Sequence, residues 1–299
     1  MNQAEKTAVI GIAVAGVLGT VFAFLGAWGG ESIGPIRSFT LLIALAFAIN
    51  IAAFIPSYLN RTDHYYDVTG SITYITVTLV ALLTTDVRDA RTFIAGFLIL
   101  IWAGRLGSFL FARVKKSDGD RRFDKIKHSW VRFLMAWMLQ GLWVTLTAGA
   151  AIAAITSGSK ANFGVISTIG LGIWIAGFAI EVVADQQKGA FKADPNNDGL
   201  FINVGLWRWS RHPNYFGEIT LWIGMALIAL PALSGTQYAT LISPIFVYLL
   251  LTRVSGAPLL EKRSDKKWGG QADYEEYKAN TPELLLRPPR AGNPHLTHQ

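Results

Sequence analysis

The sequence predicts an all-α fold, a polytopic transmembrane bundle of about seven to eight helices, on three observations. Hydrophobic residues make up 52% of the 299 residues and charged residues only 16%, against about 25% charged residues in an ordinary soluble domain. Several stretches exceed the roughly 18 apolar residues that mark a spanning helix. These stretches follow one another along most of the chain, so we expect a single integral membrane domain over residues 1–299.

The expected spans follow in order from the N-terminus. The first begins after Glu5 and Lys6 and is longer than a signal-peptide core, and no small-residue cleavage pattern follows it around Trp28. It is therefore expected to be a retained helix. The eight spans, placed to within a few residues at each end, are 8–28, 37–59, 69–85, 91–112, 130–156, 163–184, 217–233 and 237–255.

The loops on the two sides of this arrangement differ in their content of lysine and arginine. They gather in the loop 113–128, in the segment after the sixth span and in the C-terminal tail, whereas the loops 29–35, 157–162 and 231–236 carry one Lys and no Arg between them. Positive loops stay on the cytosolic side of a membrane. We therefore expect the basic loops, and any cofactor pocket that they form, to face the cytosol.

Composition excludes several classes of function. The chain has no cysteine, so disulfides, thiolate metal sites and cysteine nucleophiles are excluded. The formal charge of +7 is explained by membrane topology and anionic lipid, and no nucleic-acid partner is expected. The five histidines are too scattered for a metal site. The dinucleotide fingerprint is missing as well, because Gly170 and Gly172 lie inside an apolar helix, where we expect close packing.

Two polar regions are more than simple connections. The segment 185–218 is too long for a short turn and is rich in Asn, Asp, Gly and aromatic residues. In the tail 261–289, Tyr274 and Tyr277 are spaced for one helical face and Pro282 stops the helix. We expect this tail to fold back against the cytosolic mouth of the bundle.

Ionisable side chains inside or at the ends of spans are functional candidates by default, because they are costly at membrane depth unless paired or hydrated. The alternative is snorkelling to the interface or pairing between helices. Glu181 and Asp185 are four residues apart and share a helix face. The candidates of this kind are Arg105, Glu181, Asp185, Glu218 and Arg253.

Basic residues near these carboxylates suit phosphate oxygens through charge-assisted hydrogen bonds. Lys188 and Lys192 follow Asp185 on the sixth span, and Arg105 and Arg113 share a face of the fourth. Both spans lead to the same basic side. The pattern indicates a site that accepts hydroxyl hydrogen bonds and receives phosphates.

The run 211–215, RHPNY, is the sharpest local signal. His212 could act as a general acid or as a donor to phosphate; the alternative is a loop histidine that caps a helix. Pro213 suits a first helical turn, which would place Asn214, Tyr215 and Glu218 in the first turns of the seventh span. The N-terminus of a helix that faces a polar cavity can bind an anion or another ligand through its free backbone N–H groups.

These motifs resemble a known family. The sequence GLF at 199–201, followed by SRHPNYFGE at 210–218 and an apolar helix, is similar to the C-terminal domain of the steroid 5α-reductase family, above all to its bacterial DUF1295 branch. The resemblance covers roughly 97–289 and includes the DY..Y...TP ending of the tail. The RHPNY motif alone is shared in looser form with isoprenylcysteine and phospholipid methyltransferases. The resemblance implies a bacterial inner membrane.

The resemblance also implies a helical bundle that encloses NADPH and reduces an activated carbon-carbon double bond of a sterol-like or other lipid enone. It gives Asp185 the role of the family's cofactor-binding aspartate, and Asn214 and Glu218 a place beside the nicotinamide. Glu181 stands where an asparagine is usual. The expected cofactor-binding residues are Arg105, Arg113, Glu181, Asp185, Lys192, Arg211, His212, Asn214, Tyr215, Glu218, Arg253, Glu261, Tyr274 and Tyr277.

The sequence departs from the family where the substrate carbonyl is polarised. Steroid reductases carry a Gln-Glu pair on the second span and a tyrosine three residues before the fourth-span arginine, but here Trp102 replaces the tyrosine and the second span has no Glu. The nearest substitutes are Tyr58, Tyr65, Tyr66 and Asp67, of which Tyr66 and Asp67 are the expected catalytic residues. The alternative is that these are interfacial aromatics and a helix cap.

Three functional hypotheses follow. The leading one is an NADPH-dependent membrane oxidoreductase that acts on a lipid or sterol-like substrate, with membrane lipids as its surroundings. The second is a methyltransferase that uses S-adenosylmethionine on a membrane-embedded thiol or amine. The third is a non-enzymatic lipid-binding or transport protein of the same fold. The number of Arg and Lys residues near the site favours a dinucleotide.

Overall fold

The computed structural model describes residues 1–116, 123–159 and 161–289, with side chains up to Ser108 in the fourth long helix. The contacts divide the chain into two compact units. Unit 1 comprises Met1–Thr168 and Met225–Ser243, and unit 2 comprises Ile169–Gly224 and the chain from Pro244 onward. The expectation of one membrane domain over residues 1–299 stays a prediction.

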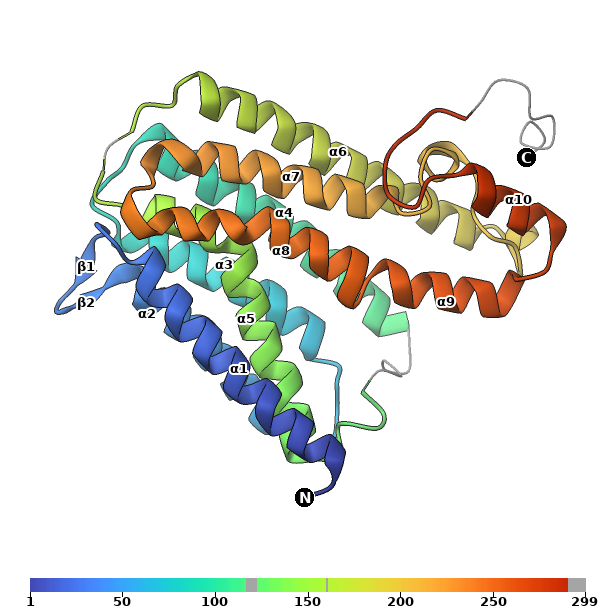
Figure 1. Cartoon of the computed structure of the whole chain (residues 1–299), viewed down its shortest axis with the longest axis horizontal. Coiled ribbons are helices and arrows are strands. Elements are labelled where there is room, and N and C mark those ends of the chain that lie inside the picture. The colour runs from blue at the N-terminus through green and yellow to red at the C-terminus, as the bar shows by residue number, and fades with distance from the viewer. Residues whose placement is uncertain (117–122, 160, 290–299) are drawn as a thin grey trace. The chain divides into compact units, whose positions relative to one another are not determined.

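The described residues are almost entirely helical, with one two-stranded hairpin (Figure 1). The α-helices and strands are α1 (Gln3–Gly26), β1 (Ser32–Ile33), β2 (Ile36–Arg37), α2 (Ser38–Leu59), α3 (Tyr66–Thr84), α4 (Ala90–Lys116), α5 (Trp130–Ile155), α6 (Val165–Ala193), α7 (Pro213–Ala229), α8 (Ser243–Leu249), α9 (Ala257–Trp268) and α10 (Ala272–Asn280). The short helical turns are η1 (Pro195–Asn197), η2 (Gly205–Arg208), η3 (Leu230–Ala232), η4 (Gly235–Ile242) and the π-helical η5 (Leu250–Val254).

Within the described residues, eight helical segments are long and apolar enough to cross a membrane. This confirms the predicted helical bundle and is consistent with an integral, multi-pass membrane protein, while the side that faces the cytosol stays a prediction. The largest differences from the expected spans are at two C-terminal ends. The sixth segment continues to Ala193 and the eighth continues to Trp268, so both carry polar residues of the candidate site on helices that begin as spans.

Unit 1 is built around α5, which is the most buried of the spans. In α5, 78% of an apolar 18-residue stretch is buried inside the structure. Glycines allow aromatic rings to pack closely here: a Cβ on Gly149 would clash with the ring of Phe22, and one on Gly141 would press on Phe47. Helices α1 and α2 are joined by the β1–β2 hairpin at one end (Figure 1). At the other end of α2, Phe54 belongs to a buried aromatic cluster.

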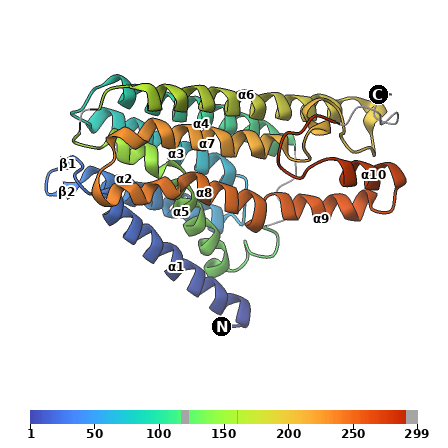
Figure 2. The same cartoon turned by 45° about the horizontal axis from the view of Figure 1, so that its top comes forward.

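Unit 2 is built on the close contact of α6 with α7, which run side by side (Figure 2). A Cβ on Gly177 would lie 2.5 Å from the amide nitrogen of Leu221, and one on Gly217 would lie 2.6 Å from that of Glu181. Gly224 packs in the same way against Gly170 and Trp174. The backbones of the two helices can therefore approach as only glycine allows.

The expectation of close packing was wrong for Gly172. A Cβ on this residue would meet nothing within 4 Å among the described residues. Gly172 lies between two helix positions that pack on α7, but it points away from them. The physical reason is the helical period: residues two apart project from nearly opposite sides of a helix.

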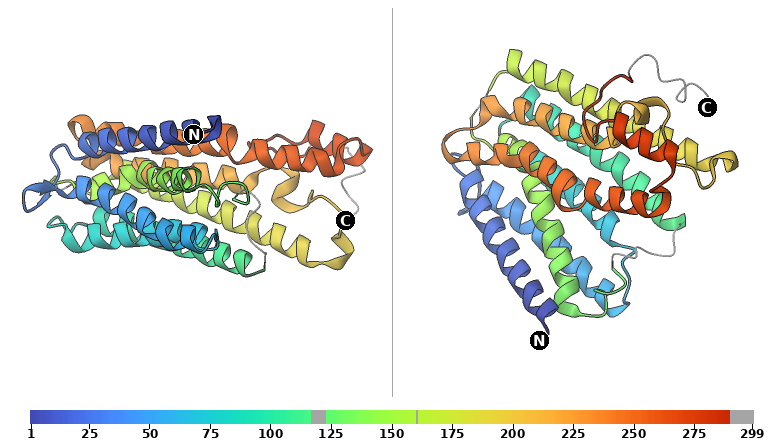
Figure 3. Two further views of the ribbon diagram at one scale, coloured as in Figure 1. Left: turned by 90° about the horizontal axis from the view of Figure 1, so that it is seen from below. Right: turned by 45° about the vertical axis from the view of Figure 1, so that its right-hand side comes forward.

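After α8 the chain passes through η5 into α9 and then turns back, so that α10 lies beside the end of α9 (Figure 3). Beyond α10 an extended strap, residues 282–287, pairs with the loop before α7. The amide of Arg211 donates to the carbonyl of Pro282 over 2.9 Å, and that of Arg287 donates to the carbonyl of Trp209 over 3.0 Å. The side chain of Ser210 donates to the carbonyl of Leu284. The tail thus folds back onto the RHPNY segment within unit 2.

Candidate functional site

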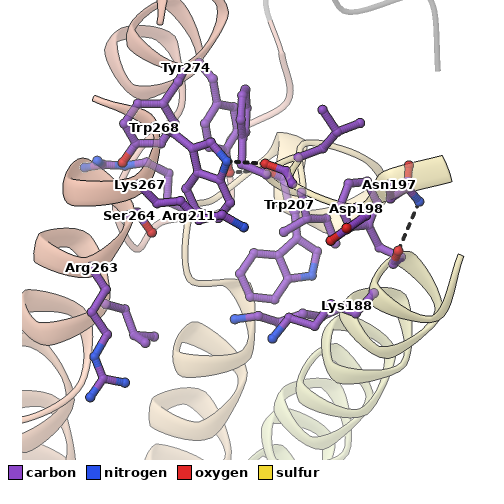
Figure 4. Close-up of a pocket in the computed structure, with 18 of the residues that line it drawn as sticks. Lys188, Asn197, Asp198, Trp207, Arg211, Arg263, Ser264, Lys267, Trp268 and Tyr274 are labelled. Atoms are coloured by element: carbon purple, nitrogen blue, oxygen red, sulfur yellow. Dashed lines mark hydrogen bonds between the residues drawn. The ribbon is translucent and has the colours of Figure 1, made fainter. Parts of the chain in front are cut away.

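A cavity of about 780 Å³ lies in unit 2, between the C-terminal turns of α6, the segment 194–212, α9 and α10 (Figure 4). Its volume falls in the range of about 300–1,000 Å³ that small-molecule and cofactor sites occupy. All the residues that line it belong to unit 2. It is therefore a site within one compact unit.

Five basic side chains line this cavity. Two come from α6 and two from α9, and in each helix they are four residues apart, so that both members of a pair lie on one helix face. The fifth comes from the RHPNY segment. The five are Lys188, Lys192, Arg211, Arg263 and Lys267. Such a group suits a ligand with more than one phosphate, because each ammonium or guanidinium can make charge-assisted hydrogen bonds to phosphate oxygens.

Two tryptophans hold the walls of the cavity in place. The indole N–H of Trp207 donates to the carbonyl of Ala184 over 3.0 Å, and that of Trp268 donates to the carbonyl of Gly199 over 2.6 Å. The Lys188 ammonium lies 4.4 Å from the centre of the Trp207 ring. Figure 4 shows this lysine beneath the indole. Trp207 is buried and Trp268 is half-buried, so Trp268 is the one of these two rings that can present a face to a planar ligand group.

At one corner of the cavity, Glu261 of α9 binds both residues that precede α7. Arg211 donates to its Oε2, and His212 Nε2 lies 2.9 Å from its Oε1. The ring of Tyr215 stacks on that of His212, with ring centres 5.4 Å apart. This corner joins the RHPNY motif to α9 with charge-assisted hydrogen bonds.

Two tyrosines of α10 close the cavity from the side of the tail. The Tyr277 hydroxyl donates to the carbonyl of Trp207 over 2.7 Å, and the Tyr274 hydroxyl donates to Asp265 over 2.9 Å. Both rings pack on Phe201. Burial raises the pKa of both phenols above its ordinary value, and the hydrogen bond to Asp265 raises that of Tyr274 further. Both hydroxyls are therefore neutral donors at neutral pH.

The segment before the RHPNY motif is fixed to α6 by a tight turn. Gly205 has φ +58°, a conformation that L side chains rarely adopt, and a Cβ there would clash with Gln187. The amide of the next residue, Leu206, donates to the Gln187 side chain over 2.9 Å. This turn positions Trp207 so that its indole N–H donates to the carbonyl of Ala184.

The structure brings together part of the residue set that the sequence predicted. The predicted residues that line the cavity are Lys192, Arg211, His212, Glu261, Tyr274 and Tyr277. Asp185 and Asn214 do not line it, but they are bonded to each other: the Asn214 amide donates to Asp185 over 3.3 Å. Glu181 is buried, Glu218 is half-buried and Arg253 is exposed, and none of these three lines the cavity.

The remaining predicted residues belong to unit 1. Arg105 lies in α4, and the side chain of Arg113 falls outside the described residues. The Tyr66 hydroxyl donates to the carbonyl of Ala136 over 3.0 Å, so its proton is already engaged. Asp67 follows in the first turn of α3. The catalytic role of Tyr66 and Asp67 and the phosphate role of the two arginines stay predictions.

Several cavity residues were missed by the sequence prediction, namely Arg263, Lys267, Trp207 and Trp268. The spacing of Arg263 and Lys267 was a usable signal, but the expected last span ended at 255, before the helix that carries them. The tryptophans gave no local signal, because their hydrogen bonds reach carbonyls that are 23 and 69 residues away.

Comparison with known proteins gives a family match and two distant relatives. The model of a family described as "Protein of unknown function (DUF1295)" matches residues 53–281, a range that contains the whole lining of the cavity. The match begins well before the 97 that the sequence motifs indicated.

The chain is 26% identical over 220 residues to an uncharacterized protein of Schizosaccharomyces pombe, a match that covers 64% of this chain and 63% of that protein. It is 28% identical over 180 residues to a protein of Methylotuvimicrobium alcaliphilum named Delta(14)-sterol reductase, covering 54% of this chain and 39% of that protein. Both matches cover less than two thirds of the relative's length. No solved structure gives a significant match.

Proposed function

This chain belongs to the DUF1295 family, and we propose that it is an NADPH-dependent membrane oxidoreductase that reduces an activated carbon-carbon double bond of a sterol-like or other lipid substrate. The observation that carries the proposal is the cavity of unit 2, where five cationic side chains and two indole rings surround about 780 Å³. The relative that is named as a sterol reductase supports both the reaction class and the lipid character of the substrate.

The residues of the cavity fit NADPH. This cofactor carries a pyrophosphate and a 2′-phosphate, and it ends in two planar ring systems. Lys188 and Lys192 on α6, with Arg263 and Lys267 on α9, can neutralise the phosphates through charge-assisted hydrogen bonds. Trp268, which is half-buried, can offer a ring face to a planar group, and the buried Trp207 holds the cavity wall through its hydrogen bond to α6.

When bound, NADPH would supply the hydride. The chain's part is to bind and orient. Asn214 and Asp185 fix the start of α7 against α6, and Tyr277 fixes Trp207 from the other side. These contacts hold the cavity wall in one geometry, which lowers the entropic cost of binding a flexible dinucleotide in a productive pose.

Two alternatives remain as rivals. S-adenosylmethionine has no phosphate, so a methyltransferase would leave Lys188 and Lys192 of α6 and Arg263 and Lys267 of α9 without a phosphate to bind. A lipid-binding protein without enzymatic activity would have no need for this group of cations at a site formed by polar segments. The cation set thus favours the dinucleotide over both.

The proposal is tested by titrating the detergent-purified protein with NADPH and following the fluorescence of the reduced nicotinamide. We expect saturable binding that weakens as salt is added, and oxidation of NADPH only when a membrane lipid extract is present. Lys192→Gln should weaken binding by about tenfold, the equivalent of about 1.4 kcal/mol for one charge-assisted contact. Saturable binding of S-adenosylmethionine with none of NADPH would contradict the proposal and favour the methyltransferase.

A further inference from the structure

Two lysines of the cavity each lie over a tryptophan ring. The ammonium of Lys188 on α6 is 4.4 Å from the centre of the Trp207 ring, and that of Lys267 on α9 is 4.6 Å from the centre of the Trp268 ring. Both lysines line the cavity, and Figure 4 shows the two pairs on different walls of it. Lys188 and Trp207 form the inner pair, and Lys267 and Trp268 form the outer pair, named for their distance from the spans.

The hydrogen bonds of the two indoles fix these positions. The indole N–H of Trp207 donates to the carbonyl of Ala184, the residue at which the predicted sixth span ends. The indole N–H of Trp268 donates to the carbonyl of Gly199, which lies beyond the end of α6 at Ala193, and Trp268 is itself the last residue of α9. The inner pair therefore lies beside the end of a span, and the outer pair lies where α6 has already ended.

The two pairs also differ in what they expose to a ligand. Trp207 is 3% exposed, whereas Trp268 is half-buried. The Trp268 ring is held by its hydrogen bond to Gly199 and by an edge-on contact with Phe201, with 67° between the ring planes, so stacking on it costs little side-chain entropy. The outer pair thus offers an aromatic surface together with a cation, and the inner pair offers a cation alone.

NADPH carries groups that match this difference. Its adenine is joined to the ribose that bears the 2′-phosphate, so a planar base and a phosphate are neighbours at that end. The pyrophosphate lies in the middle of the molecule, and the nicotinamide lies at the other end. The inference rests on the proposed function, in which the hydride passes to a lipid among the spans. The nicotinamide is therefore expected near the spans, and the adenosine at the outer pair.

Carboxylates at the outer end of the cavity disfavour a phosphate on the α6 side. Asp194 and Asp198 line the cavity from the segment that follows α6, and both are exposed. A carboxylate repels a phosphate, but it can accept a hydrogen bond from the amino group of adenine. On the α9 side, Asp265 does not line the cavity, and Lys278 balances its charge. Lys267 is therefore the better placed of the outer groups to bind the 2′-phosphate.

We propose that Lys267 binds the 2′-phosphate of the cofactor beside an adenine stacked on Trp268, so that the end of α9 selects NADPH over NADH. Lys188 binds the pyrophosphate, which both cofactors carry. Lys267 is therefore a specificity-determining residue, whereas Lys188 contributes to the affinity for either cofactor. The selection rests on one charge-assisted contact that NADH cannot make.

Binding titrations of NADPH and NADH to the detergent-purified protein test this division. The wild type should bind NADPH about tenfold more tightly than NADH. Lys267→Gln should lose that preference, with weaker binding of NADPH and unchanged binding of NADH. Lys188→Gln should weaken the binding of both cofactors and keep the preference, and the thermal transition of each ligand-free variant checks that it is folded. Loss of the preference in Lys188→Gln, or its retention in Lys267→Gln, would overturn the proposal.

Adenosine 2′-monophosphate tests the outer pair without the rest of the cofactor. This fragment carries only the adenine, its ribose and the 2′-phosphate, and it should compete with NADPH for the wild-type protein. Its affinity should fall by about tenfold in Trp268→Leu, because a base no longer stacks, and should be largely kept in Trp268→Phe. An unchanged affinity in Trp268→Leu would contradict the stacking of adenine on this ring.

The same titrations separate this proposal from the proposed function. If the wild type binds NADPH and NADH equally, the selection by Lys267 is wrong, while the dinucleotide site of the proposed function stands. If the wild type binds neither cofactor, the proposed function and the selection are both wrong.

Discussion

The side-chain amide of Asn214, in the first turn of α7, donates to the carboxylate of Asp185 on α6 over 3.3 Å. Asp185 lies one turn before Lys188, the first lysine of the cavity. The bond therefore ties the start of the helix that follows the RHPNY motif to the helix that carries two of the five cations.

Removing this bond should loosen unit 2. We expect Asn214→Ala to lower the free energy of unfolding by about 1–3 kcal/mol, because the acceptor is a charged group, and to lower the thermal transition temperature of the purified protein. Asn196→Ala is the matched control, since Asn196 is exposed and does not line the cavity. An unchanged transition in Asn214→Ala would show that the bond adds nothing to stability.

The glycine contact between α6 and α7 should be sensitive to a single methyl group. A Cβ on Gly217 would lie 2.6 Å from backbone atoms of α6, including the amide nitrogen of Glu181, and backbone cannot give way as a flexible side chain can. Gly217→Ala should cost about 1–3 kcal/mol of stability through overpacking. Gly172→Ala, where a Cβ meets nothing within 4 Å, should be neutral or slightly stabilising. Equal thermal transitions for the two variants would contradict the packing described here.

Alkaline pH should destabilise unit 2 through the tyrosines of α10. Burial raises the pKa of Tyr274 and Tyr277, so the stability that they contribute is complete below the ordinary tyrosine pKa of about 10 and is lost as pH rises through the higher folded-state values. In a pH titration followed by the ultraviolet absorbance of phenolate, Tyr274 and Tyr277 should ionise late. Tyr274→Phe and Tyr277→Phe should each remove one late-ionising group from the titration curve. Ionisation of both groups at the ordinary pH would contradict the burial of α10.

Two neighbouring lysines of α9 should behave differently toward ligand. Lys267 lines the cavity, with its ammonium 4.6 Å from the centre of the Trp268 ring, whereas Lys266 is exposed and does not line it. Lys267→Gln should weaken NADPH binding by about tenfold and reduce its dependence on salt, because one phosphate contact is lost. Lys266→Gln carries the same change in net charge and should bind NADPH like the wild type. An equal loss of NADPH affinity in the two variants would contradict this prediction, because the affinity would then depend only on the net charge of α9.

The membrane part of the fold could be predicted from the sequence because length and hydropathy are sufficient to mark a spanning helix. All eight predicted spans correspond to helical segments of the structure. What hydropathy could not give is where the helices end on the polar side. Helix α6 continues past the predicted 184 to Ala193, because charged residues in an exposed helical turn do not stop a helix.

The candidate site was predictable on the side of α6 and the RHPNY motif, where the residues are close in sequence and their spacing places them on one face. The side of α9 was missed, since Arg263 and Lys267 lie beyond the expected end of the last span. Trp207 and Trp268 could not be predicted, because each is oriented by a carbonyl that is distant in sequence. The family resemblance was confirmed by the match over residues 53–281, while the cofactor that it implied is still a proposal.

The most direct test of the central claim is a thermal-shift titration of the detergent-purified wild-type protein with NADPH, NADH and S-adenosylmethionine in parallel. A ligand that binds only the folded state raises the transition temperature, and at equal concentration the tighter ligand raises it more. We expect NADPH to stabilise the protein most, NADH less because it lacks the 2′-phosphate, and S-adenosylmethionine not at all, with the NADPH effect reduced in Lys267→Gln. Stabilisation by S-adenosylmethionine alone, or by none of the three, would contradict the account of a dinucleotide site in unit 2.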